Sequence, residues 1–164
     1  MIKSGNDDNG TAGLTDPFGR RIDYVRLSVT DKCNLRCFYC LPEGFRDFEE
    51  PEHWLRFDEI ERVIGAFAEL GVSRVRITGG EPLLRKDLPQ LVGRLADLPG
   101  ADDLSLSTNA TLLARHAQPL QQAGIARINV SLDTLRPERF KELSLIHISE
   151  PTRRRLESRL AADG

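Results

Sequence analysis

Residues 24–40 read Y-V-R-L-S-V-T-D-K-C-N-L-R-C-F-Y-C and join a strand-like run to a loop that holds all three cysteines of the chain, Cys33, Cys37 and Cys40. Three thiolates at this spacing fit one iron–sulfur cluster and leave one iron without a protein ligand. An iron with an open position can hold a substrate or cofactor, so the spacing indicates a reactive centre.

Zinc is the main alternative for these cysteines. Structural zinc takes four ligands, usually in two separated pairs. A fourth ligand could come from His53, His116 or His147, although no spacing recommends any of them. A disulfide would leave one cysteine unpaired, and nothing marks the chain as secreted. The spacing favours the cluster and leaves zinc open.

The composition is that of an ordinary globular protein. The chain has 164 residues, of which 40% are hydrophobic and 29% charged, enough for one domain with a core. Its net charge of −2 argues against general nucleic-acid binding. No apolar run approaches membrane-spanning length, and the first ten residues lack a signal-peptide core. We therefore expect a cytoplasmic protein with neither a nucleic-acid nor a membrane partner.

Strand-like and helix-like segments alternate after a polar tail, expected to be disordered, at residues 1–15. The periodicity predicts strands at 24–29, 72–78, 103–107 and 126–132, and helices at 57–70, from Asp87 as N-cap, at 112–123 and from Pro137. Pro119 is expected to kink or shorten the third helix. This alternation predicts an α/β fold with a parallel sheet and an active site at the carboxyl ends of its strands.

Each predicted strand ends in a polar or glycine-rich motif, and the four are C-N-L-R-C-F-Y-C, T-G-G-E-P, S-T-N-A and S-L-D-T. Their convergence on one edge indicates an enzyme, although turn residues alone also end strands. Gly79 and Gly80 allow the backbone to approach a ligand closely, and Glu81 could accept an ammonium group. Alone, this glycine run is more often a turn than a site.

Two arginines lie within strands that should otherwise be apolar. Period-two alternation places Arg26 on one face with Tyr24 and Ser28, and Arg76 on one face with Arg74 and Thr78. Arginines inside a barrel are costly unless they meet an anion. Strand periodicity alone does not separate this placement from an outward one between helices.

The cysteine spacing, with Tyr39 before the last cysteine, resembles the radical S-adenosylmethionine (SAM) signature. The runs G-R-R-I-D-Y-V-R-L-S-V-T-D-K-C-N-L-R-C-F-Y-C-L-P, R-I-T-G-G-E-P-L-L-R, S-T-N-A and R-I-N-V-S-L-D-T-L narrow the resemblance to the GTP 3′,8-cyclase family of molybdenum cofactor biosynthesis. The resemblance covers about Leu14 to Glu142. It makes residues 16–142 the N-terminal part of a radical SAM core, a TIM-like barrel cut after about four βα units.

The resemblance also implies the cofactors and the residues that contact them. A 4Fe-4S cluster would be held by Cys33, Cys37 and Cys40, and SAM on its open iron would yield a 5′-deoxyadenosyl radical that takes hydrogen from C3′ of GTP. No catalytic acid or base is assigned. The positions that match SAM contacts are Tyr39, Gly79, Gly80, Glu81 and Ser131, and those that match GTP contacts are Arg26, Arg76 and Ser107.

Further partners are implied by the same resemblance. They are an electron donor for the cluster, cyclic pyranopterin monophosphate synthase as the next enzyme, and a homodimeric intact protein. Two other functions stay open: a radical SAM enzyme for another substrate, and a non-catalytic fragment that binds a cluster or zinc.

The family resemblance ends after Glu142. The next residues, L-S-L-I-H-I-S-E-P-T-R, resemble a translated sequencing adapter, so we expect 143–164 to be a non-native chimeric tail. The alternative is a short strand at 145–148 followed by a basic helix from Arg153. With the barrel cut short, the fourth strand would present an open apolar edge. We then expect the chain as written neither to fold stably nor to cyclise GTP.

Overall fold

The structure is a computed structural model that describes residues 13–40 and 54–144, and the chain divides into two compact units. The described part of the first, here called the sheet unit, comprises residues 13–34 and 54–131. The described part of the second, the loop-and-helix unit, comprises residues 35–40 and 132–144. The expected tail at residues 1–15 lies mostly outside the described residues, as do residues 145–164.

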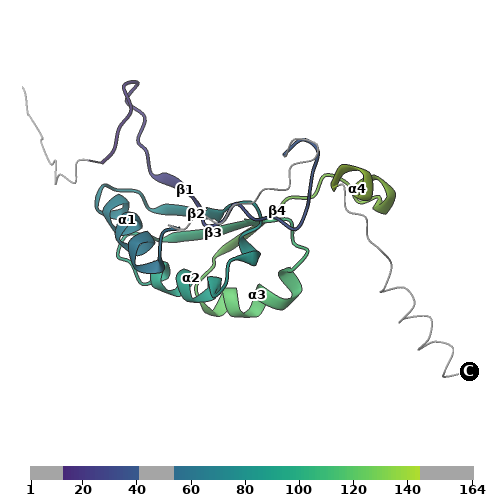
Figure 1. Cartoon of the computed structure of the whole chain (residues 1–164). Helices are drawn as coiled ribbons and strands as arrows, with labels where there is room; N and C mark the ends of the chain where they lie inside the picture. The colour runs from purple at the N-terminus through teal and green to yellow at the C-terminus, as the bar shows by residue number, and fades with distance from the viewer. Residues whose placement is uncertain (1–12, 41–53, 145–164) are drawn as a thin grey trace, which may run out of the picture. The chain divides into compact units, whose positions relative to one another are not determined.

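The sheet unit is a four-stranded parallel sheet in the order β1-β2-β3-β4. Helices α1, α2 and α3 lie together on one face of this sheet (Figure 1). The elements are β1 (Tyr24–Ser28), α1 (Phe57–Glu69), β2 (Arg74–Thr78), the 3-10 helix η1 (Pro82–Leu84), α2 (Leu88–Ala96), β3 (Asp103–Thr108), α3 (Leu113–Gln122) and β4 (Arg127–Val130). The predicted α/β fold of parallel βα units is confirmed.

The core lies between the sheet and its helices. Alternate residues of β2 and β3 are buried against them, including Ile77 and Leu106, as strand geometry requires. Helix α2 contributes four fully buried side chains, each worth about 1.5–3 kcal/mol of hydrophobic stabilisation: Leu88, Leu91, Val92 and Leu95. This packing fixes which face of each strand the helices cover.

Helix α1 buries less than its apolar stripe predicts. Ile60 and Ile64 are in the core, but Val63 and Leu70 are each 43% exposed. The helix ends at Glu69, and Leu70 follows it as C-cap. The apolar side of α1 is therefore wider than the part of the helix that contacts the sheet.

One local expectation for the other helices is corrected, and one agrees with the structure. Asp87 precedes α2, but its backbone is left-handed (φ 56) and its side chain makes no capping hydrogen bond. A side-chain cap normally requires an extended backbone at that position. Helix α3 is shorter than predicted yet continues through Pro119, as the prediction of a kink or a shorter helix allowed.

Strand β4 is shorter than the predicted 126–132. It ends at Val130, and one further ladder bond runs from the Ser131 amide to the Thr108 carbonyl at 2.9 Å. Within the described residues β4 pairs with β3 only, so its other edge has no strand beside it. Val130 is half exposed there, as expected for an open apolar edge.

The loop-and-helix unit contains α4 (Pro137–Ser144), which begins at the predicted proline. The amides of Arg36 and Phe38 donate to the carbonyls of Ser144 and Leu143, at 2.9 and 3.3 Å. These bonds tie the second half of the cysteine loop to the last turn of α4. The described start of the expected chimeric tail is thus helical, and the alternative strand at 145–148 lies outside the described residues.

Candidate functional site

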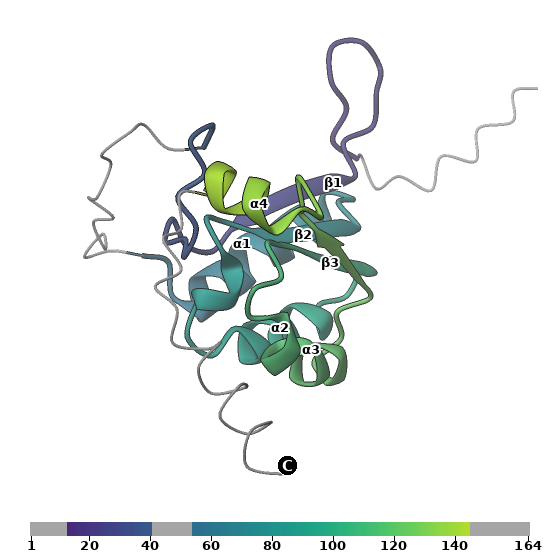
Figure 2. The ribbon, with the colours of Figure 1, turned by 90° about the vertical axis from the view of Figure 1, so that its right-hand side faces the viewer.

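The face of the sheet opposite the helices is polar. Parallel pairing aligns Arg26 with Arg76, Arg76 with Ser105, and Ser107 with Asn129. These residues alternate with the buried apolar ones, so their side chains project from the face of the sheet that is opposite the helices. Figure 2 shows α1, α2 and α3 gathered on the opposite side. Both predicted arginines therefore lie on the helix-free face of the sheet unit, and the outward placement between helices is excluded.

Arg76 is held on this face by neutral groups. Its guanidinium lies 5.4 Å from the centroid of the Tyr24 ring. With the Asn129 amide oxygen turned toward it, that oxygen accepts from both terminal nitrogens of Arg76, at 3.2 and 3.0 Å. Stacking on an aromatic ring and hydrogen bonds donated to an amide oxygen orient a guanidinium without neutralising it.

The carboxylates on this face are paired with other arginines. Asp23 accepts from Arg74 at 2.6 Å, and Asp103 pairs with Arg127. The Arg74 guanidinium lowers the pKa of the Asp23 carboxyl. Within residues 13–40 and 54–144, neither Arg26 nor Arg76 makes an ion pair. Arg26 and Arg76 therefore lie side by side on adjacent strands, with no acidic partner among the described residues.

The two glycines after β2 pack against the segment that leads into the cysteine loop. A Cβ on Gly79 would lie 2.3 Å from the Thr30 carbonyl oxygen, and one on Gly80 would lie 2.3 Å from the Asp31 carbonyl oxygen. The amides of Gly80 and Glu81 donate to the carbonyls of Thr30 and Lys32, at 2.8 and 2.7 Å. The close approach predicted for a ligand is thus made, on the Cβ side, by the chain's own backbone.

Glu81 is fully buried, with 0% of its surface exposed. One carboxylate oxygen accepts from the Leu83 amide at 3.1 Å and the Thr108 hydroxyl at 2.7 Å, and the other accepts from the Asn109 amide at 2.8 Å. Three donors from two strand ends satisfy this carboxylate. The expected ammonium contact stays a prediction, and in this structure both carboxylate oxygens are instead buried and accept hydrogen bonds from the chain itself.

Asn109 extends this network to the first cysteine. Its Oδ1 accepts from the amide and hydroxyl of Thr111, at 3.0 and 2.7 Å. Its Nδ2 donates to Asn34 Oδ1 at 2.9 Å and lies 3.9 Å from Cys33 Sγ, within range of an N–H···S hydrogen bond. The motif S-T-N-A drew attention to this asparagine as a polar group, but only the fold reveals its partner.

The two serines expected at strand ends, Ser107 as a GTP contact and Ser131 as a SAM contact, are held by fewer contacts. Ser107 is partly buried on the polar face of β3, and Ser131 is exposed just beyond the end of β4. Both residues lie at the carboxyl edge of the sheet, where the polar network of Glu81 and Asn109 also lies. The sheet unit therefore gathers most of the predicted strand-end residues at one edge.

Tyr39, Cys37 and Cys40 belong to the loop-and-helix unit. The Tyr39 hydroxyl donates to an Asp133 carboxylate oxygen, and this bond is the main reason that the pKa of Tyr39 is raised. The Cys40 amide donates to the Cys37 carbonyl at 2.9 Å, and burial raises the pKa of the Cys40 thiol. The S-L-D-T motif after β4 thus contacts the cysteine loop through its aspartate.

The donor set fits an iron–sulfur cluster by its chemistry. None of the three cysteines is in a disulfide, and soft thiolates are the ligands that such clusters require. Cys33 lies in the sheet unit and the other two in the loop-and-helix unit. Among the described residues, no three His, Cys, Asp or Glu side chains are gathered closely enough to hold a metal ion. His53 and His147, two candidates for a zinc ligand, lie outside the described residues.

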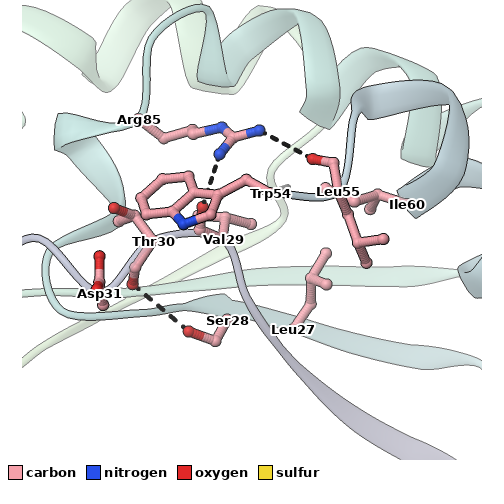
Figure 3. A pocket seen from close by; sticks show the side chains of 9 residues that line it. All are labelled: Leu27, Ser28, Val29, Thr30, Asp31, Trp54, Leu55, Ile60 and Arg85. Carbon is pink, nitrogen blue, oxygen red and sulfur yellow. Dashed lines mark hydrogen bonds between the residues drawn. The ribbon is translucent and has the colours of Figure 1, made fainter. Parts of the chain in front are cut away.

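A cavity of about 240 Å³ lies where β1 ends and α1 begins. Figure 3 shows its lining, with Arg85 above the indole of Trp54. The guanidinium lies 4.9 Å from that ring's centroid and donates to the carbonyls of Val29 and Leu55, at 3.3 and 3.1 Å. Arg85 therefore ties the chain just before the cysteine loop to the chain just before α1, a role that no sequence pattern indicated.

No helix in the described ranges has the length and apolar character needed to cross a bilayer.

Comparisons with known proteins agree with this architecture. A family model for the radical SAM superfamily matches residues 27–161. GTP 3′,8-cyclase of Heliobacterium modesticaldum is 47% identical over 150 residues, which cover 92% of this chain and 46% of that protein. The enzyme of the same name from Hydrogenovibrio crunogenus is 51% identical over 132 residues, which cover 80% of this chain and 40% of that protein. The chain thus spans less than half the length of these relatives.

Solved structures show the same fold at lower identity. BtrN in complex with AdoMet and 2-DOIA has a TM-score of 0.56 and 20% sequence identity over 76% of this chain and 51% of that chain. BtrN in an open conformation has a TM-score of 0.52 and 23% identity. At this level of identity the likeness supports the arrangement of the βα units and nothing finer.

Proposed function

The chain belongs to the radical SAM superfamily, and from that premise we propose that it supplies the N-terminal part of the active site of a GTP 3′,8-cyclase. The reaction would convert GTP to (8S)-3′,8-cyclo-7,8-dihydroguanosine 5′-triphosphate in molybdopterin biosynthesis, a lyase step. The observation that carries the proposal is the pair Arg26 and Arg76 on the polar face of the sheet, neither of which makes an ion pair with a described residue.

The residues divide into two groups by what they would hold. A 4Fe-4S cluster bound by Cys33, Cys37 and Cys40 would supply, with SAM, the 5′-deoxyadenosyl radical that takes hydrogen from C3′ of GTP. The SAM contacts are assigned to Tyr39, Gly79, Gly80 and Ser131. The chain's own task is to bind, orient and shield the reactants from water.

The two arginines are suited to a triphosphate. A guanidinium binds phosphate oxygens through paired N–H donors and stays charged at all relevant pH values. Arg76 is oriented by Tyr24 and Asn129, neither of which cancels its charge. Ser107, on the same face, is assigned to GTP through its hydroxyl. No side chain is needed as acid or base for the first hydrogen transfer.

Glu81 also has a structural role, besides the expected ammonium contact. Because it is buried and its oxygens accept three hydrogen bonds, we assign it to holding the ends of β2 and β3 together. The backbone of Gly79 and Gly80 remains available to SAM on the side away from residues 30–32.

The remaining partners follow from the same proposal. The cluster needs a one-electron donor, and the product needs cyclic pyranopterin monophosphate synthase as the next enzyme. A reducing cytoplasm suits three cysteines that are not joined in disulfides. The intact protein is proposed to be a homodimer.

The test uses the protein made from the complete gene, with its cluster reconstituted without oxygen. Arg26→Ala and Arg76→Ala should each weaken GTP binding roughly 10- to 150-fold, the range for one lost charged hydrogen-bonding group. Arg74→Ala and Arg127→Ala are matched controls, because these arginines share the face but are already paired with aspartates. SAM cleavage without any GTP binding would instead favour a radical SAM enzyme for another substrate.

A further inference from the structure

Asn109 is fixed in one orientation by its neighbours. Its backbone amide donates to buried Glu81 at 2.8 Å. Its side-chain Oδ1 accepts from the backbone amide of Thr111 at 3.0 Å. Because a backbone N–H can only donate, the atom that faces it must be the oxygen. The NH₂ group of Asn109 therefore faces Asn34 and Cys33.

Buried Glu81 holds the backbone at Asn109 more firmly than an exposed turn would. Glu81 is fully buried and receives hydrogen bonds from Leu83 in η1, which follows β2, and from Thr108 and Asn109 at the end of β3. The Thr108 hydroxyl, bonded to Glu81, also accepts from the Ala110 amide at 3.0 Å. The backbone on both sides of Asn109 is thus held in place, so its side chain cannot follow a shift of the cysteine loop without breaking these bonds.

The Asn109 amide bears on Cys33 in two ways. Nδ2 donates to Asn34 Oδ1 at 2.9 Å, and Asn34 Nδ2 donates in turn to the Thr111 hydroxyl at 2.8 Å. These two hydrogen bonds hold the side chain of Asn34, the residue after Cys33, and so restrain the chain at Cys33. The same NH₂ group lies 3.9 Å from Cys33 Sγ. Hydrogen bonds to the sulfurs of an iron–sulfur cluster are one of the factors that set its reduction potential.

We propose that Asn109 is a positioning residue that holds Cys33 for cluster binding and, through its amide N–H, raises the reduction potential of the bound cluster. An N–H dipole at a ligand sulfur favours the additional negative charge of the reduced state. Glu81 is the anchor through which β2 and β3 hold Asn109. The inference rests on the cluster in the proposed function and does not depend on GTP as substrate.

The test is an electron-paramagnetic-resonance redox titration of the reconstituted protein from the complete gene. Asn109→Leu removes the donor at similar size and adds no charge. At a fixed solution potential, the ratio of reduced to oxidised cluster should fall roughly fivefold, the effect of about one hydrogen bond. Thr111→Val removes one of the two bonds that orient the amide and should shift the ratio in the same direction by a smaller amount.

Each outcome decides the proposal. A lowered ratio with normal iron content supports it, as does loss of iron from Asn109→Leu with an unchanged circular dichroism spectrum. If Asn109→Leu does not fold, the direction of the Thr111→Val shift decides. Full iron and an unchanged midpoint in both variants would overturn it. A wild-type protein that loads its cluster but ignores GTP would refute the cyclase assignment and leave this inference standing.

Discussion

Glu81→Gln tests how the strand ends are held together. The substitution keeps the shape of the side chain but replaces one carboxylate oxygen with an NH₂ group. In the structure, the two oxygens accept from different backbone amides, those of Leu83 and Asn109. Neither amide can accept a hydrogen bond, so in both orientations of glutamine one buried N–H faces another donor. A buried donor left unsatisfied costs about 1–3 kcal/mol, and more where a charged partner is lost.

We therefore expect Glu81→Gln to lower the free energy of unfolding by about 2–3 kcal/mol. The assay is urea unfolding of the protein from the complete gene, followed by circular dichroism without oxygen. Glu69→Gln is the matched control, because Glu69 is exposed at the end of α1 and such changes usually stay within about 0.5 kcal/mol. A Glu81→Gln protein with the urea midpoint of its parent would refute the hydrogen-bonding argument.

Other predictions concern the packing around the cysteine loop. Gly80→Ala should destabilise the protein by about 1–3 kcal/mol, because the added Cβ would lie 2.3 Å from a backbone oxygen. Gly93→Ala, in α2, should stabilise it by about 0.5–1 kcal/mol in the same urea assay, because the added Cβ would have no atom within 4 Å outside its own helix. A change of the same sign in both variants would contradict this packing. Arg85→Ala removes two hydrogen bonds to carbonyls and the stacking on Trp54, and should cost about 2 kcal/mol. Arg115→Ala, at an exposed arginine of α3, is its control. Equal urea midpoints for the two variants would show that the contacts of Arg85 do not stabilise the fold.

The sequence predicted the sheet well because its signal is local. Period-two alternation grouped Arg76 with Arg74 and Thr78 on one face of β2 but did not decide which face the helices cover; the structure buries the alternate residues Val75 and Ile77 against the helices and so puts Arg76 on the other face. Helix α2 was equally clear, since all four of its apolar positions are fully buried. Only the ends of elements were misplaced, as for β4, where pairing with a single neighbour ends the strand at Val130.

The candidate site was less predictable because its contacts join distant segments. The glycines of T-G-G-E-P were interpreted as room for a ligand, but their Cβ side is filled by the backbone of residues 30–32. Glu81 was expected to contact a ligand because it follows these glycines, but in the structure it is buried where β2 and β3 end. A motif shows that close approach is needed, but not which partner approaches.

The most direct test of the account is the spectrum of the cluster with and without SAM. The protein from the complete gene would be reconstituted with iron and sulfide without oxygen, reduced, and measured by electron paramagnetic resonance. We expect one 4Fe-4S signal that depends on Cys33, Cys37 and Cys40 and that changes when SAM is added. A colourless protein that binds zinc, or a cluster whose signal ignores SAM, would contradict it.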